Sequence, residues 1–253
     1  MDSYQFDIVP DGADYHRCFY RGEDLSSVFE SGEFSASVAD GTFRGIFLGD
    51  YITRKFTMPD LPYTPAGTYT VRFIIADFDF ATCRRYAAHH AVIIPEEPIL
   101  RSYMNPTNNR TGGYDASYMN HIVMPSFALG LSEAFGVSHL LRFNADGQSC
   151  LCRLMTLHMV FGGTLPCDDI YGCSYSDYKE VDKCMGEEQL AAFRNNPDLR
   201  GKGMMRYWVS DVCDSSVFAV VEESCGNVAA GVARANTHSL SCAVGVRPFA
   251  LLV

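Results

Sequence analysis

Apolar positions in the first half of the chain cluster in short runs of strand length. Residues 69–80 (YTVRFIIADFDF) are rich in β-branched and aromatic residues, which predicts a strand. Residues 89–94 (HHAVII) predict a second strand, and Pro95 ends it because proline cannot donate to a sheet. Turn signals bracket short segments within residues 34–51, such as residues 43–48, and predict a strand pair there.

A loop and a helix are predicted in the middle of the chain. Residues 105–113 (NPTNNRTGG) are dense in turn formers and predict a long ordered loop, a kind of segment that often carries function. Residues 114–135 show helical spacing, in which Pro125 should kink the helix or split it in two. Gly136 is expected to cap its end. The spaced apolar positions are Tyr118, Ile122, Phe127, Leu131 and Phe135.

The other segments give weaker patterns. Residues 1–25 are polar without a sustained period and predict an irregular arm or a short edge strand. Residues 151–160 suit either strand or helix, and we favour strand. Residues 187–195 (EEQLAAFRN) predict a short helix, and residues 207–253 predict strands and loops. Because no repeat or linker divides the chain, we expect residues 26–253 to form one α+β domain with short antiparallel sheets and two or three short helices.

The C-terminal tail, CAVGVRPFALLV, combines unusual backbone and side-chain chemistry. Gly245 permits a tight turn, and Pro248 fixes the entry to an apolar terminal strand. Arg247 offers a fixed fork of donors for buried carbonyls or carboxylates. A frayed end would not carry so many large apolar side chains, so we expect this tail to be tied into a sheet.

Composition limits the partners. Thirty Asp+Glu against 20 Lys+Arg give a net charge of −10, which repels phosphate backbones, so we expect no nucleic-acid partner. No stretch approaches the roughly 20 apolar residues that span a bilayer, so we expect no membrane insertion. The N-terminal residues show no signal-peptide pattern, which predicts synthesis in a cytoplasm. The 10 cysteines are then expected to be reduced thiols.

Two histidines and two aspartates suggest a metal or acid–base site at first. His89 and His90 follow Asp77 and Asp79 closely in the chain, and carboxylates at alternate strand positions share a face. Adjacent histidines point to opposite faces of a strand, however, so only one of them could join such a site. We therefore favour a structural role for this group.

No other motif carries catalysis. Asp211 and His238 could belong to a hydrolase triad, but no Gly-x-Ser-x-Gly elbow, phosphate loop or dinucleotide fingerprint occurs. Cys150 and Cys152 stand too close for a zinc knuckle, and the Cys167 and Cys173 pair stands too far apart. The acidic pairs at residues 168–169 and 187–188 lack the spacing of a calcium loop. We expect no metal, no cofactor and no enzymatic activity.

Several segments follow one another in a recognisable order over residues 30–253. They are GDYIT from Gly49, IADFDF from Ile75, His89-His90 with the run to Pro95, MNPTNNRTGGY from Met104, Phe135-Gly136 with His139, Asn144-Ala145, Tyr207-Trp208 and GVRPF from Gly245. Together they resemble an uncharacterised domain that is widespread in phages and prophages of gut Firmicutes and is often found on virion structural proteins.

Members of that family look like relatives of C-type-lectin-like proteins whose C-terminal segment is rewritten by diversity-generating retroelements. In those proteins a Tyr-Trp strand and a final Gly-x-Arg strand frame the variable segment. The resemblance implies that Tyr207, Trp208, Gly245, Arg247 and Pro248 form the frame here. The residues expected to form the binding surface are Val221, Glu223, Ser224, Asn227, Ala229, Ala230, Val232, Arg234, Asn236, His238 and Ser239.

The segment between the frame residues departs from the family pattern. Many members carry an Asn-rich stretch there, whereas residues 219–243 keep Asn only at Asn227 and Asn236. Adenine-directed mutagenesis of Asn codons yields Ser, Cys, Ala, Val, Arg, Thr, His, Leu or Gly, and these residues fill the segment. It does not yield Glu222 or Glu223, and ordinary drift in a structural loop is the alternative explanation.

The resemblance implies a virion location and a function in attachment. The expected protein is a capsid or tail appendage, such as a fibre, whose C-type-lectin-like domain binds a protein or glycan on the host cell. It would also contact other virion proteins, and the arm at residues 1–25 is expected to anchor it in the virion or to contact a neighbouring subunit. A homo-oligomer is expected, with a trimer favoured, because repetition turns weak contacts into avidity. One alternative is a decoration or assembly protein without receptor recognition. Another is an enzyme similar to formylglycine-generating enzymes, which act through cysteines and copper.

Overall fold

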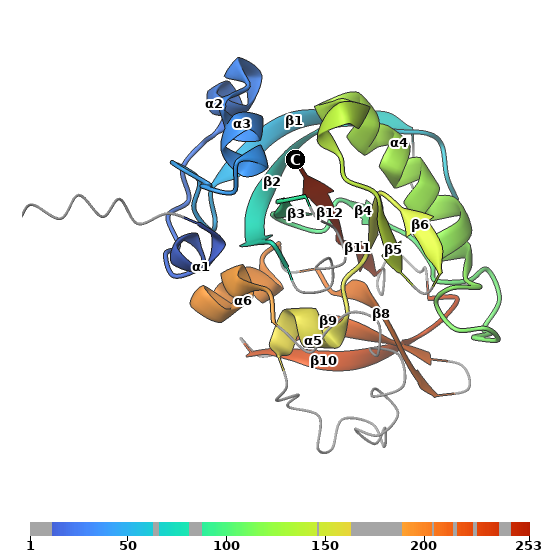
Figure 1. Cartoon of the computed structure of the whole chain (residues 1–253). Coiled ribbons are helices and arrows are strands. Elements are labelled where there is room, and N and C mark those ends of the chain that lie inside the picture. The colour runs from blue at the N-terminus through green and yellow to red at the C-terminus, as the bar shows by residue number, and fades with distance from the viewer. Residues whose placement is uncertain are drawn as a thin grey trace, which may run out of the picture.

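The computed structural model describes residues 12–62, 66–80, 88–145, 147–162, 189–203, 205–214, 217–224, 227–237 and 244–253. Within these ranges the chain has a mixed α+β fold, with several antiparallel or mixed sheets and few short helices (Figure 1). The α+β class expected from the sequence is thus confirmed. None of the helices in the described ranges is long and apolar enough to cross a membrane.

The first sheet contains the C-terminal strand. Its order is β1-β2-β3-β12-β7, and every neighbouring pair is antiparallel. The strands are β1 (Tyr51–Met58), β2 (Gly67–Phe78), β3 (Ala91–Pro95), β7 (Cys152–Leu154) and β12 (Pro248–Leu252). Because β12 lies between β3 and β7, the tail is tied into the sheet as the sequence predicts.

The second sheet is built mainly from the last quarter of the chain. Its order is β10-β9-β8-β11-β4, in which β11 pairs parallel to β8 and the other pairs are antiparallel. The strands are β4 (Leu100–Arg101), β8 (Tyr207–Asp214), β9 (Val217–Ser224), β10 (Asn227–Arg234) and β11 (Gly245–Val246). A separate two-stranded sheet joins β5 (Phe143–Ala145) and β6 (Gln148–Cys150).

Most helices are one or two turns long, and the described residues contain more of them than the two or three that the sequence predicts. They are α1 (Ala13–His16), α2 (Ser26–Ser31), α3 (Glu33–Ala39), α4 (Met124–Phe135), α5 (Leu157–Phe161) and α6 (Ala191–Asn195). A π-helical turn, η2 (Met119–Val123), leads directly into α4, and the short 3-10 helices are η3 (Val137–His139) and η5 (Pro197–Gly201).

The centre of the first sheet, formed by the end of β2 with β3 and β12, is buried on both faces, whereas β1 and the start of β2 are exposed on one face. One face packs against α2, α3 and α4, where the ring of Phe127 lies 4.5 Å from that of Phe56. The other face packs against α5, α6, β8 and β9, as Figure 1 shows for the layer below the sheet. A strand covered on both sides needs apolar residues at every position. This double burial explains why residues 69–80 and 89–94 form nearly continuous apolar runs.

The helix α4 lies close against β1. A Cβ atom on Gly130 would stand 2.5 Å from the carbonyl oxygen of Thr57, so only glycine permits this approach. The helix is not split at Pro125: η2 continues directly into α4, and Pro125 lies in the first turn of the α-helical part, where its missing N–H breaks no α-helical hydrogen bond. The extra residue of a π-turn changes the helical register, and Ile122 is 43% exposed instead of facing the core. Gly136 ends the helix as expected.

Two strand predictions are wrong in whole or in part. Residues 34–39 belong to the helix α3, and residues 43–48 form turns, with Phe43 at a φ of 51° and fully buried. The segment 151–160 is a strand only at its start, in β7. Thr156 then accepts a hydrogen bond from the backbone N–H of Met159, and this N-cap begins α5.

The predicted short helix near Pro197 is present but starts later. α6 begins at Ala191, after Leu190 in an extended conformation, and ends before Pro197 as expected. Residues 187–188, which the sequence places in its first turn, lie outside the described residues. The loop at residues 105–113 is irregular, as predicted.

The described part of the N-terminal arm, residues 12–25, contains α1 and packs on the sheet. Arg17 Nε donates to Asp77 at 2.6 Å, and Arg21 Nη2 donates to Asp50 at 2.6 Å. Both carboxylates are buried. Ion pairs from the half-buried Arg17 and the exposed Arg21 to buried carboxylates therefore hold this part of the arm to the domain.

Candidate functional site

The two framing segments that the resemblance implies are neighbours in the structure. Gly245 pairs parallel with Tyr207, and its N–H donates to the carbonyl oxygen of Arg206 at 2.8 Å. A Cβ atom on Gly245 would lie 2.5 Å from Cβ of Pro98 and 2.8 Å from Sδ of Met205. A side chain at this position would push the segments apart, which explains the glycine.

Arg247 lies fully buried behind this junction. Its Nε donates to the carbonyl oxygen of Pro95 at 2.9 Å, and Nη2 donates to that of Glu96 at 2.7 Å. Nη1 donates to the carbonyl oxygens of Leu199 and Arg200 at 2.9 and 3.3 Å. The sequence predicts carbonyls or carboxylates as its acceptors, and the structure selects carbonyls.

Aromatic rings complete the packing around the frame. The guanidinium carbon of Arg247 lies 5.3 Å from the ring centre of Tyr207 and 5.5 Å from that of Phe193. Desolvation lowers the pKa of Arg247, but an arginine stays protonated in proteins. Trp208, also buried, donates Nε1–H to the carbonyl oxygen of Ser102 at 2.8 Å. The frame thus joins β3, β4, β8, η5 and the C-terminal strand.

The predicted binding residues divide into several groups. Val221 in β9 and Ala230 in β10 are each 1% exposed, so their side chains pack in the core and not on the surface. Arg234 is exposed and Asn236 is half-buried, at the end of β10 and just after it.

The other predicted binding residues are placed less fully. The backbones of Glu223, Ser224, Asn227, Ala229 and Val232 belong to the β9–β10 hairpin, whose register pairs Ser224 with Asn227. Their side chains, and all of His238 and Ser239, lie outside the described part of the structure.

The two histidines and two aspartates that the sequence places close together have different neighbours in the structure. The side chain of His89 is 47% exposed and that of His90 is 3% exposed, so the two rings face different surroundings as expected. Asp79 contacts His89 Nδ1 at 2.7 Å and accepts the backbone N–H of His90 at 2.9 Å. Asp77 faces Arg17 instead. Within the described ranges, no three His, Cys, Asp or Glu residues could hold a metal ion together.

The structure describes only some of the remaining candidate residues. Asp211 is fully buried and accepts the backbone N–H of Leu157 at 2.8 Å, and burial raises its pKa to about 7. Cys152 is a buried free thiol whose Sγ donates to the carbonyl oxygen of Met124 at 3.5 Å, and burial raises its pKa. Cys150 is half-buried, and its Sγ donates to the carbonyl oxygen of Phe143 at 3.5 Å. Cys167 and Cys173 lie outside the described residues.

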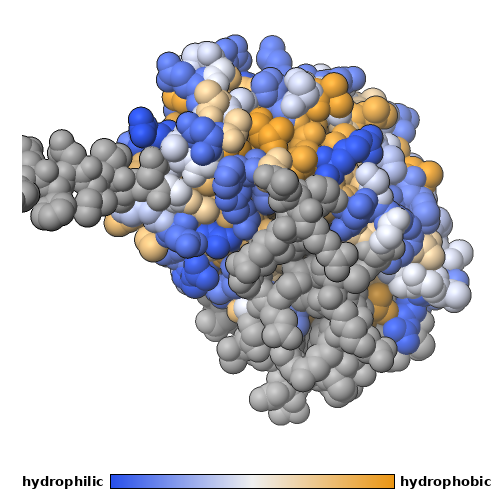
Figure 2. All heavy atoms as spheres, in the orientation of Figure 1, coloured by the Kyte–Doolittle hydropathy of each residue, from blue (hydrophilic) through white to orange (hydrophobic). Residues whose placement is uncertain are grey.

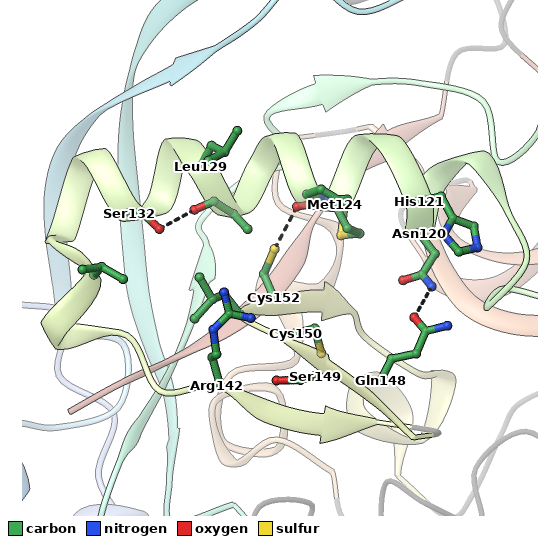
Figure 3. A pocket seen from close by; sticks show the side chains of 14 residues that line it. Asn120, His121, Met124, Leu129, Ser132, Arg142, Gln148, Ser149, Cys150 and Cys152 are labelled. Atoms are coloured by element: carbon green, nitrogen blue, oxygen red, sulfur yellow. Dashed lines mark hydrogen bonds between the residues drawn. The ribbon is translucent and has the colours of Figure 1, made fainter.

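A pocket that the sequence did not reveal lies between α4 and the β5–β6 hairpin. It has a volume of about 670 Å³ (Figure 3). Met124 and Leu129 line it from the helix, and Arg142, Gln148 and Cys150 line it from the hairpin side. One end is bridged by a hydrogen bond from Asn120 Nδ2 to Gln148 Oε1, at 3.0 Å. One signal in the sequence could have indicated the pocket: Leu129 is apolar but lies outside the stripe of buried residues on α4.

The comparisons with known proteins do not assign the fold or the site: no family model, no curated protein and no solved structure matches the chain.

Proposed function

We propose that this chain is a bacteriophage virion protein, a capsid or tail appendage, whose C-type-lectin-like domain binds the host cell surface. The observation that carries the proposal is the pairing of Gly245 with Tyr207, closed by the buried Arg247. This junction fixes both ends of the segment between them at one place in the fold. Exposed residues within such a segment can change without loss of the scaffold, which suits a recognition surface.

The binding surface proposed is smaller than the one expected from the sequence. Val221 and Ala230 are removed because they are buried. Arg234 and Asn236 remain, because their side chains reach the surface beyond β10. A polar surface of this kind fits a protein or glycan partner better than an apolar small molecule.

Multivalent binding to cells tests this proposal. The full chain is displayed on beads and incubated with a panel of gut Firmicutes cells, and bound beads per cell are counted. We expect binding to one or more strains, reduced at least about tenfold in an Arg234→Ala/Asn236→Ala double variant. Lys55→Ala, an exposed change in β1, is the matched control and should leave binding unchanged. Binding that is absent from every strain, or equal in the double variant, would contradict the proposal.

A virion assembly role without receptor recognition is the second candidate. The observation that favours it is the pocket beside α4, because Leu129 and Val137 at its rim are each 66% exposed. Large apolar side chains exposed together often mark a contact with another protein. If bead-bound protein ignores all cells but associates with itself, this second function becomes the better account.

A further inference from the structure

The pocket runs along the edge of a strand. Gln148, Ser149 and Cys150 are consecutive residues of β6, and all three line it. Side chains of successive strand residues point to opposite faces, so a cavity lined by three in a row faces the backbone edge of the strand. Among the described strands, β6 pairs with β5 and with no other. An open strand edge of this kind is a template for an added strand.

The opposite wall of the pocket is apolar. Met124, Pro125, Ala128 and Leu129 line it from α4, and Leu129 is 66% exposed. Figure 2 shows hydrophobic surface near the end of α4 that lies beside the C-terminus. A groove with a strand edge on one side and an apolar helix on the other suits an extended peptide with apolar side chains on one face.

The charge of the pocket is opposite to that of the whole chain. Arg142 and His121 line it, and no carboxylate does so among the described residues. Arg142 is exposed and forms no salt bridge within the described part of the chain. The chain as a whole carries a net charge of −10. An acidic peptide would therefore complement the pocket.

The first eleven residues of the chain have these properties. In MDSYQFDIVPD, the apolar Tyr4, Phe6 and Ile8 alternate with polar residues, which is the period of a strand. The segment holds three aspartates and no lysine or arginine. Pro10 would end the pairing, because it has no N–H to donate.

The geometry favours binding between copies. The described chain begins before α1, which lies across the molecule from α4 in Figure 1. Eleven extended residues reach at most about 36–40 Å. A folded chain of 253 residues has a radius of gyration of about 18 Å, so a path around its surface to the opposite side is longer than this reach. The same segment of a second copy meets no such limit.

We propose that residues 1–11 of one copy bind as an added strand along β6 of a second copy, with their apolar side chains against α4. The contact is head-to-tail, so repetition yields a closed ring or an open chain of subunits. The proposal does not depend on receptor recognition, because it concerns a different face of the domain.

Complementation between two defective variants tests the proposal. Phe6→Asp disables the segment at residues 1–11 but leaves the groove intact. Leu129→Asp disables the groove but leaves that segment intact. By analytical ultracentrifugation of the full chain, we expect the wild type to associate and each variant alone to associate at least tenfold more weakly. A mixture of the two variants should form heterodimers. Lys55→Asp, at an exposed position of β1, is the control and should associate like the wild type.

A charge exchange gives an independent measurement. Arg142→Glu should weaken association, and Asp7→Arg in the same chain should restore part of it. Circular dichroism of each variant checks that the domain is folded. A wild type that stays monomeric up to about millimolar concentration would overturn the proposal, and so would folded single variants that associate normally. If each variant alone associates weakly and their mixture does not restore association, the interface is symmetric. This result would also overturn the proposal.

Discussion

The guanidinium of Arg247 and the carbonyl oxygen of Pro95 are joined by a hydrogen bond of 2.9 Å in the buried centre of the protein. They are 152 residues apart in sequence: Arg247 directly precedes the last strand, and Pro95 ends β3. A buried charge is tolerated only when it is fully hydrogen-bonded. Four carbonyl groups accept hydrogen bonds from this cation. Its hydrogen bonding therefore depends on the relative position of three separate segments of the chain.

Replacing Arg247 should therefore destabilise the whole domain. In Arg247→Lys the charge remains, but an ammonium group cannot reach all four carbonyls with the same fixed geometry. We expect a loss of about 2–4 kcal/mol in the free energy of unfolding, because buried acceptors lose their donors. Urea denaturation followed by fluorescence measures it. Arg234→Lys, at an exposed position, should change stability by less than about 0.5 kcal/mol; equal losses in both variants would contradict this explanation.

Part of this arrangement could be predicted from the sequence. An arginine within an otherwise apolar tail is unusual enough to indicate buried hydrogen bonding, and the run from Pro248 indicates a strand. The long β2 was also predictable, because β-branched and aromatic residues recur along most of its length. These signals are local, so no knowledge of the tertiary structure was needed.

Other features could not be predicted because a signal had two meanings. Asp40-Gly41 marks a turn, but the turn follows the helix α3 and not a strand. Phe43 then adopts a positive φ that burial of its ring sustains. In the segment 151–160, Thr156 was an available N-cap signal for the change from strand to helix. The pocket depends on packing between segments far apart in sequence, so only the structure reveals it.

The close approach at Gly245 gives a second prediction. Gly245→Ala places a Cβ atom 2.5 Å from Cβ of Pro98, so the backbone must shift. We expect a loss of about 1–3 kcal/mol in stability, typical of overpacking, measured as a shift of the urea midpoint. Gly67→Ala is the matched control, because its Cβ would meet nothing closer than 3.7 Å. Similar midpoints for the two variants would show that the junction is looser than described.

Asp211 gives a third prediction, about pH. Its pKa is about 7 in the folded chain, because burial raises it from a value near 3.9 in the unfolded chain. The folded state therefore binds more protons between about pH 4 and 7, and the stability from this group is lost as the pH rises through that range. At about 1.4 kcal/mol per pKa unit, the limit is about 4 kcal/mol.

The variant Asp211→Asn cannot titrate, so its stability should fall less than that of the wild type between pH 5 and pH 8. Free energies of unfolding measured at several pH values give the two slopes. Asp198→Asn, at an exposed position, should keep the slope of the wild type. If Asp211→Asn also keeps it, the titrating group lies elsewhere.

Cysteine reactivity gives a fourth prediction. Cys152 is buried and its pKa is raised, so little thiolate forms near neutral pH, whereas Cys18 is exposed. Brief treatment of the native protein with iodoacetamide should modify Cys18 and leave Cys152 unmodified, as peptide mass spectrometry can show. Labelling in denaturant should reach both. Rapid native labelling of Cys152 would contradict its placement against α4.

The N-terminal arm gives the last prediction. The carboxylate of Asp77 is 3% exposed, and Arg17 supplies its countercharge. Arg17→Ala leaves that charge buried and unpaired, which typically costs about 3–5 kcal/mol. Arg17→Lys keeps a countercharge and should lose less than half as much. Thermal unfolding of both variants checks the ranking, with Lys55→Ala as the surface control. If Arg17→Ala unfolds like the wild type, residues 12–25 are an attachment to the domain and not a part of its folded core.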